Sequence, residues 1–236
     1  MEEIKTPINR YCDLKNEVEL LAKKYNRNPQ EIKILVVTKG KPISCFNEFI
    51  EAGIREFAES RIQEVLEKKR QLPDVTFHLI GTLQTKKVPK VIGLFKLIHS
   101  VDSLDLAKKI SDSSLKQGIV QEVLLQVNTS NEEAKHGFTK EQLLIDFEQI
   151  VALPGILLRG LMTMAAHMKV NSEEEREITR KSFSLLYDLK KSLHEQYKQK
   201  LTNFTELSMG MSQDYEIAIE QGATILRIGS HFFSRM

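Results

Sequence analysis

The chain has 236 residues, 41% of them hydrophobic and 28% charged, as is usual for a soluble globular protein. Its 34 basic and 32 acidic residues give a formal net charge of +2, too balanced to indicate binding to nucleic acid or to a membrane. It has only two cysteines, no signal-peptide pattern, and no apolar run near the roughly 18 residues of a membrane span. We therefore expect a cytoplasmic protein without a disulfide framework.

Short apolar runs alternate with helical patterns along the chain. A helix over 8–26 comes first, because its hydrophobic residues recur at three- and four-residue spacing. We then expect eight strands, at 33–39, 54–58, 76–81, 94–101, 120–128, 156–164, 206–209 and 224–228. Helices are expected at 43–52, 61–71, 86–91, 103–116, 140–153, from 171 onward and at 214–221. Ser44, Ser103 and the acidic run 171–175 are the expected helix starts.

The repeated strand–helix order predicts an α/β fold, a (β/α)₈ TIM barrel with an extra N-terminal helix, in one domain spanning 1–236. The length agrees with the roughly 250 residues typical of such barrels. The structural rival is an open doubly wound sheet, which would carry a glycine-rich dinucleotide turn after its first strand. The sequence at 38–41, Thr-Lys-Gly-Lys, is not such a turn, so the barrel is favoured.

Lys39 ends the first predicted strand, directly after a buried aliphatic run. Barrels place their ligands at the carboxyl ends of their strands. A partly desolvated amine at this position has a lowered pKa and can act as a nucleophile toward an aldehyde. The alternative is a lysine that only extends its side chain to water, and this segment alone does not decide between the two.

The turns after the seventh and eighth predicted strands form a second candidate group. Barrels often hold a phosphate at this corner. Ser208, Gly210 and Ser212 lead directly into a helix, and Gly229 and Ser230 follow the last strand. Glycine allows close backbone approach and serine supplies hydroxyl donors, although both also cap helices for structural reasons alone. Together with the lysine of the first strand, the two turns predict an anion cradle.

Arg227 lies one residue inside the end of the last predicted strand. It could simply pair with a neighbouring carboxylate, or it could point toward a ligand at the barrel centre. An amine for an aldehyde, a cradle for a phosphate and a charged partner for a ring nitrogen together describe a pyridoxal 5′-phosphate (PLP) site. Because arginine is always protonated, the ring nitrogen should stay unprotonated, which argues against demanding carbanion chemistry.

Several blocks of sequence carry a family resemblance, namely 37–42 (Val-Thr-Lys-Gly-Lys-Pro), 78–84 (His-Leu-Ile-Gly-Thr-Leu-Gln), 158–162 (Leu-Arg-Gly-Leu-Met), 207–212 (Leu-Ser-Met-Gly-Met-Ser), 218–219 (Ala-Ile) and 227–229 (Arg-Ile-Gly). From about residue 8 to 233 the chain resembles the pyridoxal phosphate homeostasis proteins of the YggS/PROSC type, whose fold is similar to the barrel domain of bacterial alanine racemase. The resemblance implies that Lys39 holds PLP as a Schiff base and that Arg227 faces the ring nitrogen. It also implies that serines and glycine surround the phosphate: Ser208, Ser212, Gly229 and Ser230.

The resemblance also implies a function. The chain would carry or buffer PLP in intracellular vitamin B6 homeostasis, without strong catalytic turnover. Its expected partners are PLP itself and PLP-dependent apoenzymes, and we expect a monomer that binds neither nucleic acid nor a membrane.

Three departures from the family pattern bear on these expectations. Ala58-Glu59-Ser60 stands where the family usually has Gly-Glu-Asn, so a side-chain contact from that loop is in question. Lys86-Lys87 replaces the usual Asn-Lys, and the chain stops slightly short of many relatives.

Two other functions are alternatives. A PLP-dependent amino-acid racemase needs an acid/base group on each face of its substrate adduct. Lys39 could serve one face, but in alanine racemase the opposing tyrosine comes from a second domain, and this chain ends after the barrel. A Schiff-base aldolase without cofactor would be colourless, whereas a PLP protein absorbs visible light.

The six histidines show no metal-binding spacing, so we expect no metal site. His78 and His99 lie in predicted strands and are expected to pack or to form hydrogen bonds.

Overall fold

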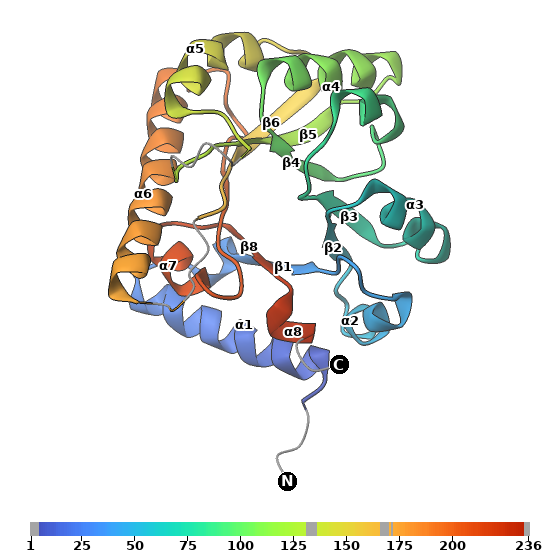
Figure 1. The fold of residues 1–236 in the computed structure, drawn as a ribbon, viewed down its shortest axis with the longest axis vertical. Helices are drawn as coiled ribbons and strands as arrows, with labels where there is room; N and C mark the ends of the chain where they lie inside the picture. The colour runs from blue at the N-terminus through green and yellow to red at the C-terminus, as the bar shows by residue number, and fades with distance from the viewer. Residues whose placement is uncertain (1–4, 131–135, 166–169, 171, 234–236) are drawn as a thin grey trace.

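The computed structural model describes residues 5–130, 136–165, 170 and 172–233. Its centre is a closed barrel of eight parallel strands in which β8 pairs with β1 (Figure 1). The strands are β1 (Lys33–Val37), β2 (Glu56–Glu59), β3 (Thr76–Leu79), β4 (Leu97–Val101), β5 (Gln121–Gln126), β6 (Ile156–Met162), β7 (Glu206–Ser208) and β8 (Ile225–Ile228). The predicted barrel is therefore confirmed, and each strand is slightly shorter than expected.

Helices surround the barrel on its outer side. They are α1 (Pro7–Lys24), α2 (Asn47–Glu51), α3 (Ile62–Gln71), α4 (Leu104–Lys116), α5 (Lys140–Val151), α6 (Glu173–Gln196), α7 (Tyr215–Glu220) and α8 (Ser230–Phe233), with the 3₁₀ helices η1 (Pro29–Glu31), η2 (Ile43–Phe46) and η3 (Thr85–Lys90). The extra N-terminal helix is confirmed as α1. It packs beside α7 and α8, so the first and last helices lie together (Figure 1).

Two hydrophobic clusters follow from the alternation of side chains along the strands. Outward side chains pack under the helices in the larger cluster, which holds bulky aromatic residues such as Phe57, Phe147 and Phe183. Burying one such ring stabilises the fold by about 1.5–3 kcal/mol. Inward side chains form a smaller cluster inside the barrel: Leu35, Val37, Ala58, Leu97, Leu124, Met162 and Ile225. This inner cluster underlies the site at the carboxyl ends of the strands.

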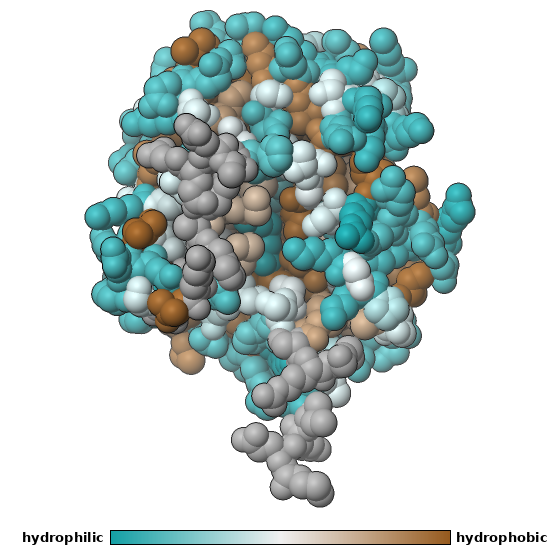
Figure 2. All heavy atoms as spheres, in the orientation of Figure 1, coloured by the Kyte–Doolittle hydropathy of each residue, from teal (hydrophilic) through white to brown (hydrophobic). Residues whose placement is uncertain are grey.

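The surface is hydrophilic over most of the face in Figure 2, and hydrophobic side chains are visible toward the middle of the view. No helix within the described ranges is both long enough and apolar enough to cross a membrane.

Two helix starts use the predicted serines. The Ser103 hydroxyl accepts a hydrogen bond from the Leu106 N–H at the start of α4, which confirms the predicted cap. Ser172 and Glu175 form a capping box at the start of α6, where each side chain accepts the backbone N–H of the other. Asn171, also expected at this start, lies outside the described residues.

Two predicted helices differ in the structure. The segment expected as a helix over 43–52 begins as η2 and only then becomes α2, and Ser44 lies inside η2. The prediction that Ser44 caps the helix is therefore wrong: Pro42 occupies the N-cap position, with no side-chain bond. The helix expected over 86–91 is η3, which contains Pro89. Proline has no N–H to donate, so it disfavours an α-helix in this segment.

Candidate functional site

A cavity of about 360 Å³ opens at the carboxyl ends of the strands. Its volume lies in the range of small-molecule pockets, and its position is the one predicted for the site of a barrel. Its lining comes from β1 and β8 and from the segments that follow β1, β2, β3, β6, β7 and β8: Val37, Lys39, Ser60, Ile80, Met164, Met211, Ser212, Gln213, Asp214, Arg227, Gly229 and Ser230.

Most of the predicted site residues line this cavity: Lys39, Ser212, Arg227, Gly229 and Ser230. Ser208 and Gly210 are not among the residues that line the cavity. Gly210 has φ +93°, and a Cβ there would lie 2.6 Å from the Ala218 Cβ. Backbone conformation and close packing therefore account for this glycine.

Lys39 lies at the rim of the cavity and is exposed. β1 ends at Val37, so the lysine belongs to the following loop rather than to the strand itself. The lysine is thus exposed and lies beyond the strand end, whereas the sequence placed it as the last residue of the strand. Among the described residues nothing forms a hydrogen bond or ion pair with the Lys39 amine. Lys41, in contrast, places its amine 5.2 Å from the centre of the Phe233 ring.

The backbone around Lys39 is held from β2 and α3. The Thr38 hydroxyl donates to Glu59 Oε1 at 2.7 Å, and Lys68 Nζ donates to the Thr38 carbonyl oxygen at 3.0 Å. The Gly40 N–H donates to Glu64 Oε2 at 2.9 Å. Glu59 and Lys68 are both buried and form an ion pair with each other. These contacts fix the segment on either side of Lys39.

Burial raises the pKa of Glu59, and the hydrogen bonds from Lys68 and Thr38 oppose that rise. The Lys68 amine also lies 5.2 Å from the centre of the Phe46 ring. Sequence reasoning missed this buried pair, although a lysine on the apolar face of α3 was a visible signal.

Arg227 projects from β8 into the barrel and is only 4% exposed. Its Nη1 donates to Ser208 Oγ at 2.8 Å, and its Nη2 donates to the Thr163 carbonyl oxygen at 2.9 Å. Burial lowers the pKa of Arg227 to about 10, and Asp214 opposes that shift. The guanidinium therefore stays charged at neutral pH, with two neutral oxygens fixing its plane.

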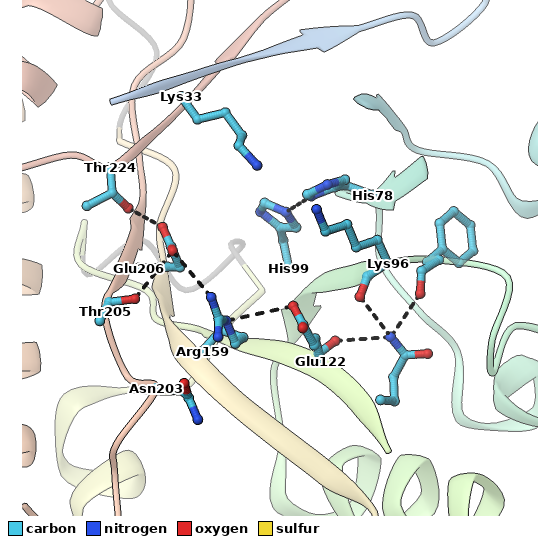
Figure 3. A network of polar contacts seen from close by, with 12 residues as sticks. Lys33, His78, Lys96, His99, Glu122, Arg159, Asn203, Thr205, Glu206 and Thr224 are labelled. Carbon is cyan, nitrogen blue, oxygen red and sulfur yellow. Dashed lines mark hydrogen bonds and ion pairs between the residues drawn. The ribbon is translucent and has the colours of Figure 1, made fainter. Parts of the chain in front are cut away.

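Two buried histidines, His78 and His99, lie beside each other in the barrel (Figure 3) and continue the contacts of Arg227. Ser208 Oγ lies 2.9 Å from His99 Nδ1, and His99 Nε2 lies 3.0 Å from His78 Nδ1. His78 Nε2 lies 3.2 Å from Glu56 Oε2, at the start of β2. The expectation that these histidines form hydrogen bonds is confirmed, and Glu56 was missed.

Charged side chains fill the opposite, amino-terminal end of the barrel (Figure 3). Glu56 accepts hydrogen bonds from Lys33 at 2.8 Å and Lys96 at 2.5 Å. Arg159 lies between Glu122 at 3.7 Å and Glu206 at 3.8 Å. The hydrogen bond from His78 is the largest cause that holds the pKa of Glu56 well below its usual range, and the hydrogen bonds from Lys33 and Lys96 add to it. This end of the barrel is thus filled by ion pairs, whereas the other end opens into the cavity.

No group of three or more His, Cys, Asp or Glu side chains in the described part of the chain is arranged to hold a metal ion.

Comparison with known proteins places this geometry in a family. The alanine racemase N-terminal domain family matches residues 14–234. A pyridoxal phosphate homeostasis protein from Aquifex aeolicus is 41% identical over 203 residues, which cover 85% of this chain and 86% of the relative. The chain belongs to the pyridoxal phosphate homeostasis protein family.

Solved structures agree with this membership. PipY from Synechococcus elongatus PCC7942, in a structure with PLP bound, matches with a TM-score of 0.77 and 32% identity, covering 92% of this chain and 99% of PipY. Alanine racemase from Clostridium difficile 630 matches with a TM-score of 0.72 and 16% identity, covering 95% of this chain and 57% of the racemase. The likeness to the racemase shows the fold alone.

The residues that depart from the usual pattern of this homeostasis protein family differ in whether they line the cavity. Ser60, at the usual asparagine position, lines the cavity. Lys86 and Lys87 belong to η3 and are not among the residues that line it. Gln213 and Asp214 line the cavity but were not predicted, although they directly follow Ser212 in sequence.

Proposed function

We propose that this protein binds PLP in the cavity and carries or buffers it in intracellular vitamin B6 homeostasis, without strong turnover. The observation that carries the proposal is that one cavity is lined by a lysine, a buried arginine and a serine–glycine corner: Lys39, Arg227, Ser212, Gly229 and Ser230. Family membership supports it, since the Aquifex relative is named a pyridoxal phosphate homeostasis protein and the PipY structure holds PLP.

Lys39 is the proposed covalent attachment point, through a Schiff base with the PLP aldehyde. Lys39 lines the cavity, and its amine has no partner among the described residues, so no bond to one of them must break before it reacts. Its exposed position at the rim lets the cofactor reach it and leave, which suits a carrier. A ring bound in the cavity would cover the amine and exclude water from it.

Ser212, Gly229 and Ser230 are the proposed phosphate ligands. Ser212 Oγ accepts the His231 N–H at 3.2 Å, so its hydroxyl hydrogen can be donated to an oxyanion. A Cβ at Gly229 would lie 3.2 Å from both the Cβ and the carbonyl oxygen of Val37, so glycine keeps this corner close to β1. Gly210 is proposed to shape the loop rather than to touch the phosphate.

Arg227 is the proposed partner of the ring nitrogen. A guanidinium has five N–H donors, and its described protein partners use two of them. The remaining donors suit an unprotonated nitrogen, since arginine cannot accept that nitrogen's proton. Ser208 is wholly buried behind Arg227, so we assign it to support of the guanidinium rather than to direct contact with the phosphate.

A cytoplasmic location, a monomeric state and PLP-dependent apoenzymes as partners complete the proposal. Both cysteines are free thiols, which is consistent with a reducing compartment.

Visible absorbance tests the proposal. After incubation with PLP and removal of unbound ligand, the protein should be coloured, and Lys39→Ala should lose the colour while Lys41→Ala keeps it. A colourless wild-type protein would contradict PLP binding and favour a cofactor-free aldolase. An amino-acid racemase assay separates the other alternative: turnover comparable with dedicated racemases and lost in Lys39→Ala would refute the carrier function.

A further inference from the structure

The hydrogen bonds that link Glu56 to Arg227 have one direction, which follows from the Glu56 end. The Glu56 carboxylate is ionised and only accepts, so His78 Nε2 must carry the proton. Burial lowers the pKa of both histidines, that of His99 strongly, so both rings are neutral. His78 Nδ1 is then an acceptor, and His99 must donate to it from Nε2.

The donor and acceptor roles at Ser208 and Arg227 follow from those of His99. With its single proton on Nε2, His99 has an acceptor at Nδ1, so the Ser208 hydroxyl donates to it. Ser208 Oγ then offers its lone pairs to Arg227 Nη1, which can only donate. The Glu56 end therefore sets the arrangement, and the Arg227 end is compatible with it. Both histidines carry their proton on Nε2.

Because these residues are buried, water cannot easily take the place of any of these hydrogen-bond partners. His78 is 2% exposed, His99 and Ser208 are fully buried, and Arg227 is 4% exposed. A buried donor or acceptor that loses its partner costs about 1–3 kcal/mol, because water cannot substitute for it. The charged groups at the two ends further polarise the bonds between them.

We propose that Glu56, His78 and His99 are positioning residues that act through Ser208 to orient Arg227 toward a ring nitrogen in the cavity. We call the series Glu56, His78, His99, Ser208 and Arg227 the relay. It spans the barrel, from the ion pairs at the amino-terminal end to the cavity at the carboxyl end. Because the hydrogen bonds of the relay have one direction, Ser208 Oγ accepts from the guanidinium. Other N–H groups of Arg227 are then left for the ligand. The inference rests on the proposed function, since the ring nitrogen is that of PLP.

The first test uses the protein without ligand. Nitrogen-detected histidine NMR at neutral pH should show His78 and His99 as neutral rings protonated at Nε2. A proton on Nδ1 of either ring, or a doubly protonated ring, would overturn the relay. Because this measurement needs no cofactor, its result stands apart from whether PLP binds.

The second test compares PLP with an analogue in which a ring C–H replaces the nitrogen. Wild-type protein should prefer PLP by about tenfold, the value of one hydrogen bond from a charged donor. Ser208→Ala and His99→Phe should reduce that preference several-fold by lowering affinity for PLP more than for the analogue. Ser114→Ala is the matched control, because its buried hydroxyl makes no hydrogen bond with any described residue and lies outside the relay.

The outcomes separate the two proposals. If neither compound binds, the proposed function fails, whatever the NMR shows. If both bind and the preference survives in Ser208→Ala and His99→Phe, the positioning role is wrong while PLP binding stands. Should His99→Phe fail to fold, His99→Gln replaces it, and Ser208→Ala carries the comparison alone if necessary.

Discussion

Lys68 Nζ lies 3.0 Å from the carbonyl oxygen of Thr38, so a buried ammonium on α3 holds the backbone directly before Lys39. The same ammonium pairs with Glu59, which also accepts the Thr38 hydroxyl. A pair of opposite charges between β2 and α3 thereby fixes the loop that presents the reactive amine.

Lys68→Met should destabilise the protein by about 3–5 kcal/mol, because it leaves the Glu59 carboxylate buried without its cation. Urea unfolding measures this loss. Lys86→Met, an exposed lysine on η3, is the control and should change stability by less than about 0.5 kcal/mol. A Lys68→Met/Glu59→Leu double variant should recover part of the loss. Equal stability of Lys68→Met and wild type would show that the pair does not hold the loop.

Gly210→Ala should cost more stability than Gly118→Ala, although both glycines have positive φ. At Gly118 a Cβ meets nothing within 4 Å, so the substitution costs only the backbone strain, about 1 kcal/mol. At Gly210 the Cβ would also lie 2.6 Å from the Ala218 Cβ and 2.9 Å from Leu226 Cδ2. Thermal unfolding of the two variants compares these costs, and equal losses would contradict the packing explanation.

Stability should fall as the pH decreases below about 6.5, because His78 and His99 stay neutral in the folded protein while their unfolded counterparts gain protons. Burial is the main cause of both depressed pKa values. Near His78, Glu56 opposes the shift and Lys33 and Lys96 add to it. Each histidine contributes a slope of up to about 1.4 kcal/mol per pH unit between its unfolded and folded pKa values.

Urea unfolding between pH 7.5 and 5.5 measures that slope, above the pH range in which most carboxylates titrate. His99→Gln should reduce it by about half. His136→Gln, in which the substituted residue is exposed, should leave it unchanged. A wild-type protein equally stable at both pH values would show that the histidines are not held neutral.

Arg227→Glu should change the absorbance of bound PLP, because a carboxylate beside the ring nitrogen favours its protonation. Spectra recorded across pH measure the change, and Arg227→Lys is the companion variant that keeps the positive charge. An unchanged spectrum in Arg227→Glu would count against the pairing of Arg227 with the ring. Urea unfolding of the same samples shows whether the variant is folded.

The barrel could be predicted because its signals are local. Each strand is an apolar run between turn residues, and Ser103 and Ser172 mark helix starts through bonds within their own turns. At Ser44 the local signal was misleading, because a 3₁₀ helix takes the place of the expected start of an α-helix. The position of Lys39 in a loop could not be predicted, because it depends on β1 ending at Val37.

The relay could not be predicted for a different reason. His78, His99, Ser208 and Arg227 come from β3, β4, β7 and β8, and only the closure of the barrel brings them together. Ser208 therefore seemed from sequence to belong with Ser212 at the phosphate corner. In the structure its side chain faces the barrel interior instead.

Covalent capture tests the central claim most directly. The protein is incubated with PLP, reduced with borohydride and digested, and the modified peptide is identified by mass spectrometry. We predict that the reduced adduct lies on Lys39 alone and is absent from Lys39→Ala. An adduct on Lys41, or no adduct in the wild-type protein, would contradict the account.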